Sequence, residues 1–212
     1  MNNKIHILIT DDHAIVLQGL RQIISTTDDL VVAGEADNGS AIIKLARECY
    51  WDVCLLDIAM PQRNGIDILK MLKKEHPRKQ VLMLSMHPED QYAVRAIQSG
   101  ASGYITKQSA PAELVNAIRK VARGEKYISS ALAGRLAEMV AGGNLPPLER
   151  LSTREYEVLR LMTSGRSLTQ IASELNISIA TVSTYRSRLL EKLCLANTAE
   201  LIRYGLENGL SD

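Results

Sequence analysis

The sequence predicts an α/β domain built on a doubly wound parallel sheet of five strands, followed by a smaller all-helical domain. Three observations carry this prediction. Five short apolar runs alternate with helical patterns within the first 123 residues. The middle run, residues 53–56, is apolar without interruption, as in a strand buried on both faces of a parallel sheet. Beyond residue 148 every apolar pattern has the helical period.

The strands and helices of the first domain are expected to alternate along the chain. The five strands are predicted at residues 5–9, 30–35, 53–57, 81–84 and 103–107. Apolar residues recur at helical spacing after each of them, in residues 15–24, 42–46, 66–72, 92–97 and 112–121. Asn64 and Gly65 turn the chain into the third helix, which stops before Pro77. Such alternation is typical of a doubly wound parallel sheet.

Polar and charged side chains follow these strands at their carboxyl ends. They are Asp11, Asp12, Asp57, Ser85 and Lys107. Because open α/β sheets bind ligands beyond the carboxyl ends of their strands, we expect these groups to meet at one edge. Clustered carboxylates suit Mg²⁺, a hard cation that takes few protein ligands and keeps several waters. The metal would hold a phosphate against Asp57, with Lys107 balancing the charge and Ser85 donating to a phosphoryl oxygen.

Composition indicates a cytoplasmic protein of two domains. The 212 residues are 46% hydrophobic and 23% charged with a net charge of +1, so bulk charge favours neither a nucleic-acid nor a membrane partner. No signal-peptide core follows Met1, and no apolar run approaches the roughly 20 residues of a membrane span. Cys49, Cys54 and Cys194 lack metal-binding spacing and fit unpaired thiols in a reducing compartment.

A linker is expected between the domains. Ser129 or Ser130 can cap a helix with one apolar stripe, formed by Leu132, Leu136, Met139 and Val140. Gly142 and Gly143 end that helix, and residues 144–147 have the composition of a linker. We therefore expect a first domain, a linker helix with its linker, and a second domain at residues 4–123, 124–147 and 148–212.

The second domain is predicted to be a four-helix unit with a helix-turn-helix motif. Capping boxes open its first two helices, Ser152 with Glu155 and Ser167 with Gln170. A tight turn at residues 176–178 precedes the third helix, which ends near residue 193. Its N-terminal part carries small polar side chains and arginines, which suit a recognition helix in the major groove. Basic and acidic residues balance within residues 148–212, so DNA binding would depend on a local face.

With these motifs in place, residues 4–123 resemble a response-regulator receiver domain, a flavodoxin-like fold with the strand order 2-1-3-4-5. The resemblance matches Asp57 to the phospho-accepting aspartate, and Asp11 and Asp12 to the acidic pair that binds Mg²⁺ with it. It also matches Ser85 to the family's switch hydroxyl, Tyr104 to its switch aromatic residue and Lys107 to its lysine. On phosphorylation Ser85 would swing toward the phosphoryl group and Tyr104 would turn inward.

Three positions near the site depart from the family pattern or add to it. Ala59 would offer only its backbone carbonyl to the metal. Gln108 stands where many receivers have a cis proline, and a cis bond before a non-proline residue costs about 2.5–4 kcal/mol. His87 borders the site, as an exposed loop histidine or as a group that tunes the lifetime of the phosphoryl group.

Residues 151–193 resemble the LuxR-type helix-turn-helix, so the chain is similar from end to end to the NarL/FixJ subfamily of response regulators. The motifs are Leu151 to Glu155, Ile171-Ala172, Ile177-Ser178, Thr181-Val182 and Lys192-Leu193. The resemblance implies that the side chains facing base edges are Ser183, Thr184 and Ser187. The candidates for phosphate contacts are Arg186, Arg188 and Lys192. Members commonly have lysine and histidine where Ser183 and Tyr185 stand, so the resemblance implies the fold of this domain but not its base preference.

The resemblance implies a cytoplasmic two-component transcription regulator. A sensor histidine kinase would phosphorylate Asp57 with Mg²⁺, and this would control binding of the second domain to paired half-sites of double-stranded DNA. The phosphorylated chain would be a homodimer, in which the last helix pairs two DNA-binding domains through Ala199, Leu201, Ile202 and Leu206. Neither membrane binding nor enzymatic action on an external substrate is expected.

Two alternatives remain open at this point. The first is an aspartyl-phosphate phosphatase of the haloacid dehalogenase type, whose nucleophile follows the first strand in an Asp-x-Asp motif. Here the candidate acceptor, Asp57, ends the third strand, and turnover of a small phosphate ester would favour this enzyme. The second is a receiver controlled by a partner protein or ligand instead of phosphate, which a phosphorylation assay would distinguish.

Overall fold

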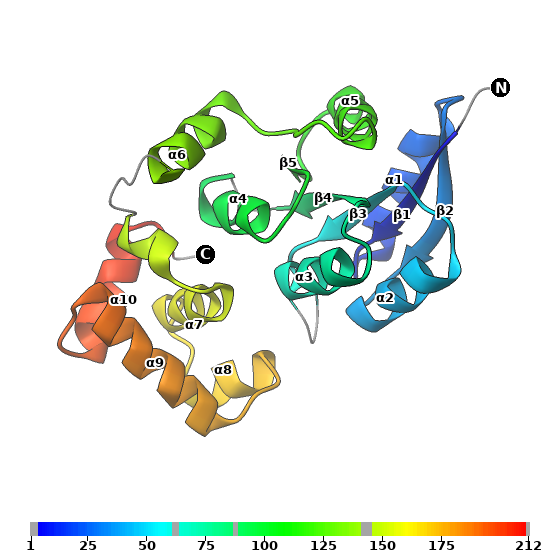
Figure 1. Cartoon of the computed structure of the whole chain (residues 1–212). Coiled ribbons are helices and arrows are strands. Elements are labelled where there is room, and N and C mark those ends of the chain that lie inside the picture. Colours follow the sequence, from blue (N-terminus) through cyan, green and yellow to red (C-terminus); the bar gives the residue numbers. More distant parts are fainter. Residues whose placement is uncertain (1–3, 61–63, 87–88, 141–145, 211–212) are drawn as a thin grey trace. The chain divides into compact units, whose positions relative to one another are not determined.

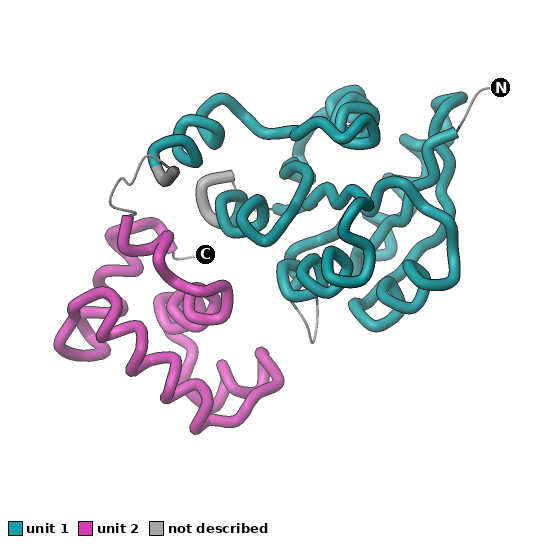
Figure 2. Tube along the Cα trace, in the orientation of Figure 1, with its two compact units in different colours: residues 1–138 teal, residues 139–212 magenta. Residues whose placement is uncertain are grey.

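The chain forms two compact units in the computed structural model, which describes residues 4–60, 64–86, 89–140 and 146–210. The units are residues 1–138 and 139–212 (Figure 1 and Figure 2). The division falls inside helix α6 (Ser130–Val140), the helix expected after the first domain. The domain boundaries proposed from the sequence stay predictions, because a division by compactness does not test them. The glycine pair expected to end α6, Gly142 and Gly143, lies outside the described residues.

Five parallel strands form the sheet of the first unit. They are β1 (Ile5–Thr10), β2 (Leu30–Ala36), β3 (Val53–Asp57), β4 (Gln80–Ser85) and β5 (Gly103–Thr106). The strands pair in the order β2-β1-β3-β4-β5, which confirms the predicted fold class. Every residue of the central strand β3 is buried, as its uninterrupted apolar run predicts.

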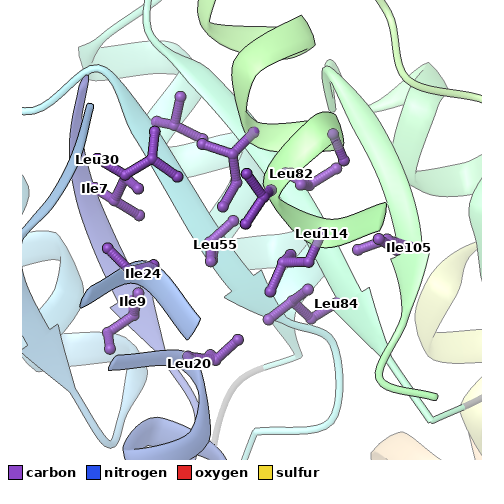
Figure 3. Packing of buried hydrophobic residues seen from close by; sticks show 14 of the residues in the cluster. Ile7, Ile9, Leu20, Ile24, Leu30, Leu55, Leu82, Leu84, Ile105 and Leu114 are labelled. Atoms are coloured by element: carbon purple, nitrogen blue, oxygen red, sulfur yellow. The ribbon is translucent and has the colours of Figure 1, made fainter. Parts of the chain in front are cut away.

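Helices complete the layers of the first unit. They are α1 (Ala14–Ser25), α2 (Gly39–Glu48), α3 (Gly65–Glu75), α4 (Glu89–Gln98) and α5 (Pro111–Ala122). α1 contacts α5, and α2 contacts α3. Between the sheet and the α1–α5 pair lies a buried cluster to which Leu20, Leu55 and Leu114 belong (Figure 3). Each fully buried leucine contributes about 1.5–3 kcal/mol, so this cluster anchors the strands whose ends carry the polar residues.

The segment after α5 returns to the sheet and covers part of the edge of β5. Tyr127 forms a parallel bridge with Gly103, in which the Tyr104 N–H donates to the Tyr127 carbonyl at 3.1 Å. The Tyr127 N–H in turn donates to the Ser102 carbonyl at 3.0 Å. A Cβ at Gly103 would stand 2.6 Å from the Tyr127 carbonyl oxygen, so only glycine permits this approach. The backbone of Tyr104 is therefore bonded to the chain that leads into α6.

The second unit is all-helical, as predicted. It contains a short 3₁₀ helix, η1 (Pro147–Arg150), followed by α7 (Thr153–Thr163), α8 (Leu168–Glu174), α9 (Ile179–Leu193) and α10 (Thr198–Glu207). Both predicted capping boxes are present at the starts of α7 and α8. Asn176 makes the tight turn with a φ of 53°, a left-handed conformation that asparagine tolerates well. Ser178 then caps α9 by accepting the Thr181 N–H.

The apolar side of α10 is used differently from the sequence-based expectation. Leu201 is fully buried inside its own unit, where α10 packs on α7 and Gly205 meets Thr163. It is therefore not available to a second domain, and its place in the expected pairing surface was wrong. Ala199 is exposed, Ile202 is half-buried and Leu206 is 51% exposed, so these three residues of the expected surface remain accessible on α10.

Candidate phosphorylation site and nucleic-acid interface

The carboxyl ends of neighbouring strands place the central residues of the candidate site. Asp57 ends β3 and is 1% exposed; Ser85 ends β4 and is equally buried. Asp11 directly follows β1 and is fully buried. Lys107 directly follows β5, where its backbone N–H donates to the Ser85 carbonyl at 2.8 Å. The parallel register thus brings four residues, expected together from the sequence, to one edge of the sheet.

Lys107 joins the two buried carboxylates. Its Nζ lies 2.6 Å from Oδ2 of Asp11 and 3.0 Å from Oδ2 of Asp57. The second oxygen of Asp57, Oδ1, is buried and makes no hydrogen bond within the described part of the chain. A buried carboxylate oxygen without a donor is costly, so this atom is suited to a cation or to bond formation.

The electrostatics of the site show an excess of negative charge. Burial raises the pKa of the Asp57 carboxyl; the Lys107 ammonium opposes this and the nearby Asp11 carboxylate adds to it. Burial acts to lower the pKa of Lys107, but the Asp11 and Asp57 carboxylates outweigh it and hold that pKa above its ordinary value. Lys107 therefore stays charged, while two carboxylates share its single positive charge.

A possible metal-binding group lies beside this pair. Asp11, Asp12 and His13 offer ligand atoms that all lie within 4.8 Å of one another. His13 Nδ1 is 2.8 Å from Oδ1 of Asp12 and 3.2 Å from Oδ1 of Asp11. The sequence reasoning overlooked His13, whose signal was its position directly after the acidic pair. Asp57 stands outside this group and is linked to Asp11 through Lys107.

The other residues predicted for this site lie around the strand ends in the sequence. Tyr104 is 3% exposed and lines a cavity of about 310 Å³ together with Tyr127, so its side chain is already inside in this structure. The Lys107–Gln108 peptide bond is trans. Ala59 is exposed just beyond β3, and His87 lies outside the described residues.

The candidate DNA-binding side chains lie on α9. Val182, Leu189 and Leu193 bury one side of this helix in its own unit. The predicted side chains that are exposed on this helix are Thr184, Ser187 and Arg188. Two further predicted side chains, Ser183 and Arg186, are half-buried. Arg186 and Arg188 form no ion pair with the described residues, so their charges are available to a ligand. Lys192 differs, because it is bound to Glu155.

Together, the fold and the two sites define a regulator class in which an α/β domain with a buried acidic site is joined to a helix-turn-helix domain. The family described as response regulator receiver domain matches residues 7–119. The family described as bacterial regulatory proteins, luxR family, matches residues 149–205. The chain belongs to the response regulators of the NarL/FixJ type, with a receiver domain and a LuxR-type DNA-binding domain.

Similar proteins match along almost the whole chain. Transcriptional regulatory protein MctR of Rhizobium johnstonii is 39% identical over 98% of this chain and 95% of its own length. Response regulator UvrY of Escherichia coli K12 is 33% identical over 97% of this chain and 95% of its own. The structure of RcsB from Salmonella enterica serovar Typhimurium bound to promoter DNA with the phosphomimetic BeF3− is 31% identical. Its TM-score is 0.70, with 95% of this chain and 98% of that chain covered.

Within the described ranges, each helix is too short or too polar to cross a membrane.

Proposed function

We propose that a sensor histidine kinase phosphorylates this response regulator on Asp57 with Mg²⁺, and that the phosphoryl group controls DNA binding by α9. One observation carries the proposal: the buried Asp57 carboxylate has Lys107 on one oxygen and no hydrogen bond, among the described residues, on the other. An acceptor needs one oxygen oriented by a cation and one oxygen that can form the new bond. The matching receiver family supports the role of the kinase as phosphoryl donor.

The donor set at the site fits Mg²⁺. Asp11, Asp12 and Asp57, with the Ala59 backbone carbonyl, would hold the ion, because oxygen donors are its preferred ligands. The buried Oδ1 of Asp57 and the two carboxylates around one lysine support this assignment. When bound, the ion supplies positive charge that neutralises the carboxylates and the incoming phosphoryl oxygens.

The protein's own groups account for the transfer. A carboxylate oxygen of Asp57 bonds to phosphorus as the bond from phosphorus to the donor's imidazole nitrogen breaks, and the imidazole leaves with that electron pair. Lys107 stabilises charge on the phosphoryl oxygens, and the Ser85 hydroxyl donates to one of them. The product is an acyl phosphate at the end of β3, which adds charge and acceptor oxygens beside Ser85.

Acetyl phosphate tests the proposal directly. Incubated with it and Mg²⁺, the full chain is expected to gain the mass of one phosphoryl group, and chelation of Mg²⁺ should prevent the gain. Intact-mass spectrometry measures both. Steady turnover of p-nitrophenyl phosphate would instead favour the phosphatase alternative. No mass gain under any condition would favour a receiver controlled by another ligand.

The DNA-binding part of the proposal assigns α9 to the major groove. A symmetric homodimer would bind two half-sites, with Ala199, Ile202 and Leu206 contributing to the contact between domains. The promoter-bound RcsB structure supports DNA as the ligand. A cytoplasmic location is part of the proposal, because the proposed ligand is DNA. Bases would be read by Ser183, Thr184 and Ser187, and phosphates would be bound by Arg186, Arg188 and Lys192.

Single substitutions on α9 should separate positioning from base readout. Arg186→Ala or Arg188→Ala is expected to weaken binding to all sequences, and to lower the salt slope by about one, because a phosphate contact is lost. Ser183→Ala or Thr184→Ala should instead change which sequence is preferred. Gel shifts over a salt series, with a duplex selected from a random pool by the wild-type chain, measure both effects. Unchanged shifts for all four variants would remove α9 from the interface.

Phosphorylation is expected to raise the affinity of the full chain for DNA. Residues 145–212 alone should bind DNA without phosphate, because the proposed restraint by the receiver is absent. A complete change in the ratio of released to restrained chains, from 1:99 to 99:1, would need about 5.5 kcal/mol. We therefore expect a partial change for the full chain. Gel shifts of the full chain and the fragment, each with and without acetyl phosphate, measure this. Equal affinity in all four samples would contradict release from the receiver.

A further inference from the structure

Glu155 is a buried carboxylate in the first turn of α7. Its Oε2 accepts the Ser152 backbone N–H at 2.7 Å, and its own N–H donates to the Ser152 hydroxyl at 3.3 Å. The residue is only 3% exposed. A capping box explains these two hydrogen bonds, but burying a negative charge is costly unless a cation compensates it.

Lys192 supplies that cation from α9. Its Nζ lies 2.7 Å from Oε2 of Glu155, the same oxygen that accepts the Ser152 N–H. Lys192 lies in the last turn of α9, where a cation also suits the helix dipole, and its side chain is 40% exposed. The contact joins residues 37 apart in the sequence and connects two helices that pack on each other.

The contact with Lys192 affects the protonation of Glu155. Burial acts to raise the pKa of Glu155, but the Lys192 ammonium and the Ser152 groups hold that pKa below its ordinary value. The carboxylate therefore remains ionised at neutral pH. Its contribution to stability is present above the pKa of the unfolded chain and is lost as pH falls through the lower pKa of the folded state.

We propose that Glu155 and Lys192 are positioning residues for DNA recognition, which fix α9 against α7, and that Lys192 acts through Glu155 instead of binding a DNA phosphate. This inference rests on the proposed role of α9 in DNA binding and revises the role of one residue there. The apolar contacts of α9 are non-directional, whereas a short ion pair to a capped helix start fixes its position. A phosphate brought to Lys192 would also approach the Glu155 carboxylate, and like charges repel.

The two roles of Lys192 predict opposite effects of Glu155→Gln. If Lys192 positions α9, loss of the Glu155 charge weakens DNA binding although no cation has been removed. If Lys192 binds phosphate, the same substitution releases its ammonium and leaves binding unchanged or tighter. The salt slope adds a second distinction, because only the loss of a phosphate contact lowers it.

The test uses the full chain and the duplex that the wild-type chain selects from a random pool. The variants are Glu155→Gln, Lys192→Met, their combination, and Lys192→Arg. Glu207→Gln is the matched control, since Glu207 belongs to an exposed pair with Arg203 at 3.8 Å in the same unit. Fluorescence anisotropy gives the affinity at each concentration of a salt series, and circular dichroism confirms that each variant is folded.

The positioning role predicts that Glu155→Gln and Lys192→Met each weaken binding roughly tenfold, as expected for a charge-assisted hydrogen bond. The double variant should bind DNA no more weakly than either single variant, because both substitutions remove the same interaction. The salt slope should stay at the wild-type value, and Lys192→Arg should restore most of the affinity. Glu207→Gln should have no effect.

A salt slope lowered by about one in Lys192→Met, with binding by Glu155→Gln unchanged or tighter, would overturn the positioning role. Should Glu155→Gln not fold, Lys192→Met decides by its slope alone, since it leaves the cap of α7 in place. The four α9 variants described above, measured in the same series, separate the two proposals. If none of them changes binding, α9 is not the interface and the proposed role of α9 fails. If their effects are intact, a lowered slope for Lys192→Met overturns only the positioning role.

Discussion

Asp57→Asn is expected to abolish the phosphoryl mass gain from acetyl phosphate. The amide oxygen is a far weaker nucleophile than a carboxylate. Among the described residues, the carboxylates that contact Lys107 are those of Asp57 and Asp11. Intact-mass spectrometry of the wild-type and variant chains, under identical acetyl phosphate and Mg²⁺, provides the measurement. Asp12→Ala should also block the gain, by weakening the metal site, while the fold survives the removal of one clustered negative charge.

Asp37→Asn is the matched control for this experiment. Asp37 is an exposed acid that also follows the carboxyl end of a strand, β2, but it lies outside the site. It should be phosphorylated like the wild type. A mass gain at the wild-type rate in Asp57→Asn would show that another residue accepts the phosphoryl group. Equal losses in Asp57→Asn and Asp37→Asn would point to a general effect of charge instead.

Gly65→Ala is expected to cause a large loss of stability in the receiver unit. A Cβ at Gly65 would stand 2.1 Å from the Asp57 carbonyl oxygen and 2.8 Å from Cα of Ile58. Both are backbone atoms that cannot rotate away, so the start of α3 and the end of β3 would have to separate. Overpacking of this kind costs about 1–3 kcal/mol or more. The same displacement should slow phosphorylation, because the backbone that moves carries the acceptor.

Trp51 provides the measurement of this loss. It is the single tryptophan of the chain and is buried in the receiver unit, so its fluorescence reports the unfolding of that unit in urea. Gly19→Ala is the matched control. Gly19 lies within α1, where an added Cβ would meet no atom within 4 Å, and alanine there should stabilise the helix by about 0.5–1 kcal/mol. A Gly65→Ala unfolding midpoint equal to the wild type would show that this contact can relax.

Much of the fold and the site could be predicted from the sequence, because the relevant signals are local. The apolar run of β3 marks a strand buried on both faces, and Asp57 stands where that run ends. Helical periods and capping boxes likewise depend on residues a few positions apart. Once the strands are known to be parallel, their carboxyl ends must share an edge, so Asp11, Ser85 and Lys107 could be assigned to one site without coordinates.

Local periodicity, by itself, indicated which side of each helix or strand is apolar but not which residues that side contacts. That Lys107 binds both Asp11 and Asp57, or that Lys192 binds Glu155, depends on contacts between segments far apart in the chain. The burial of Leu201 in its own unit has the same origin, because an amphipathic helix pattern does not say which partner covers its apolar side. The sequence therefore determined the strands, the helices and which polar residues stand at the carboxyl ends of the strands. Only the tertiary structure decided their partners, because register and helix packing bring together side chains that no sequence spacing relates.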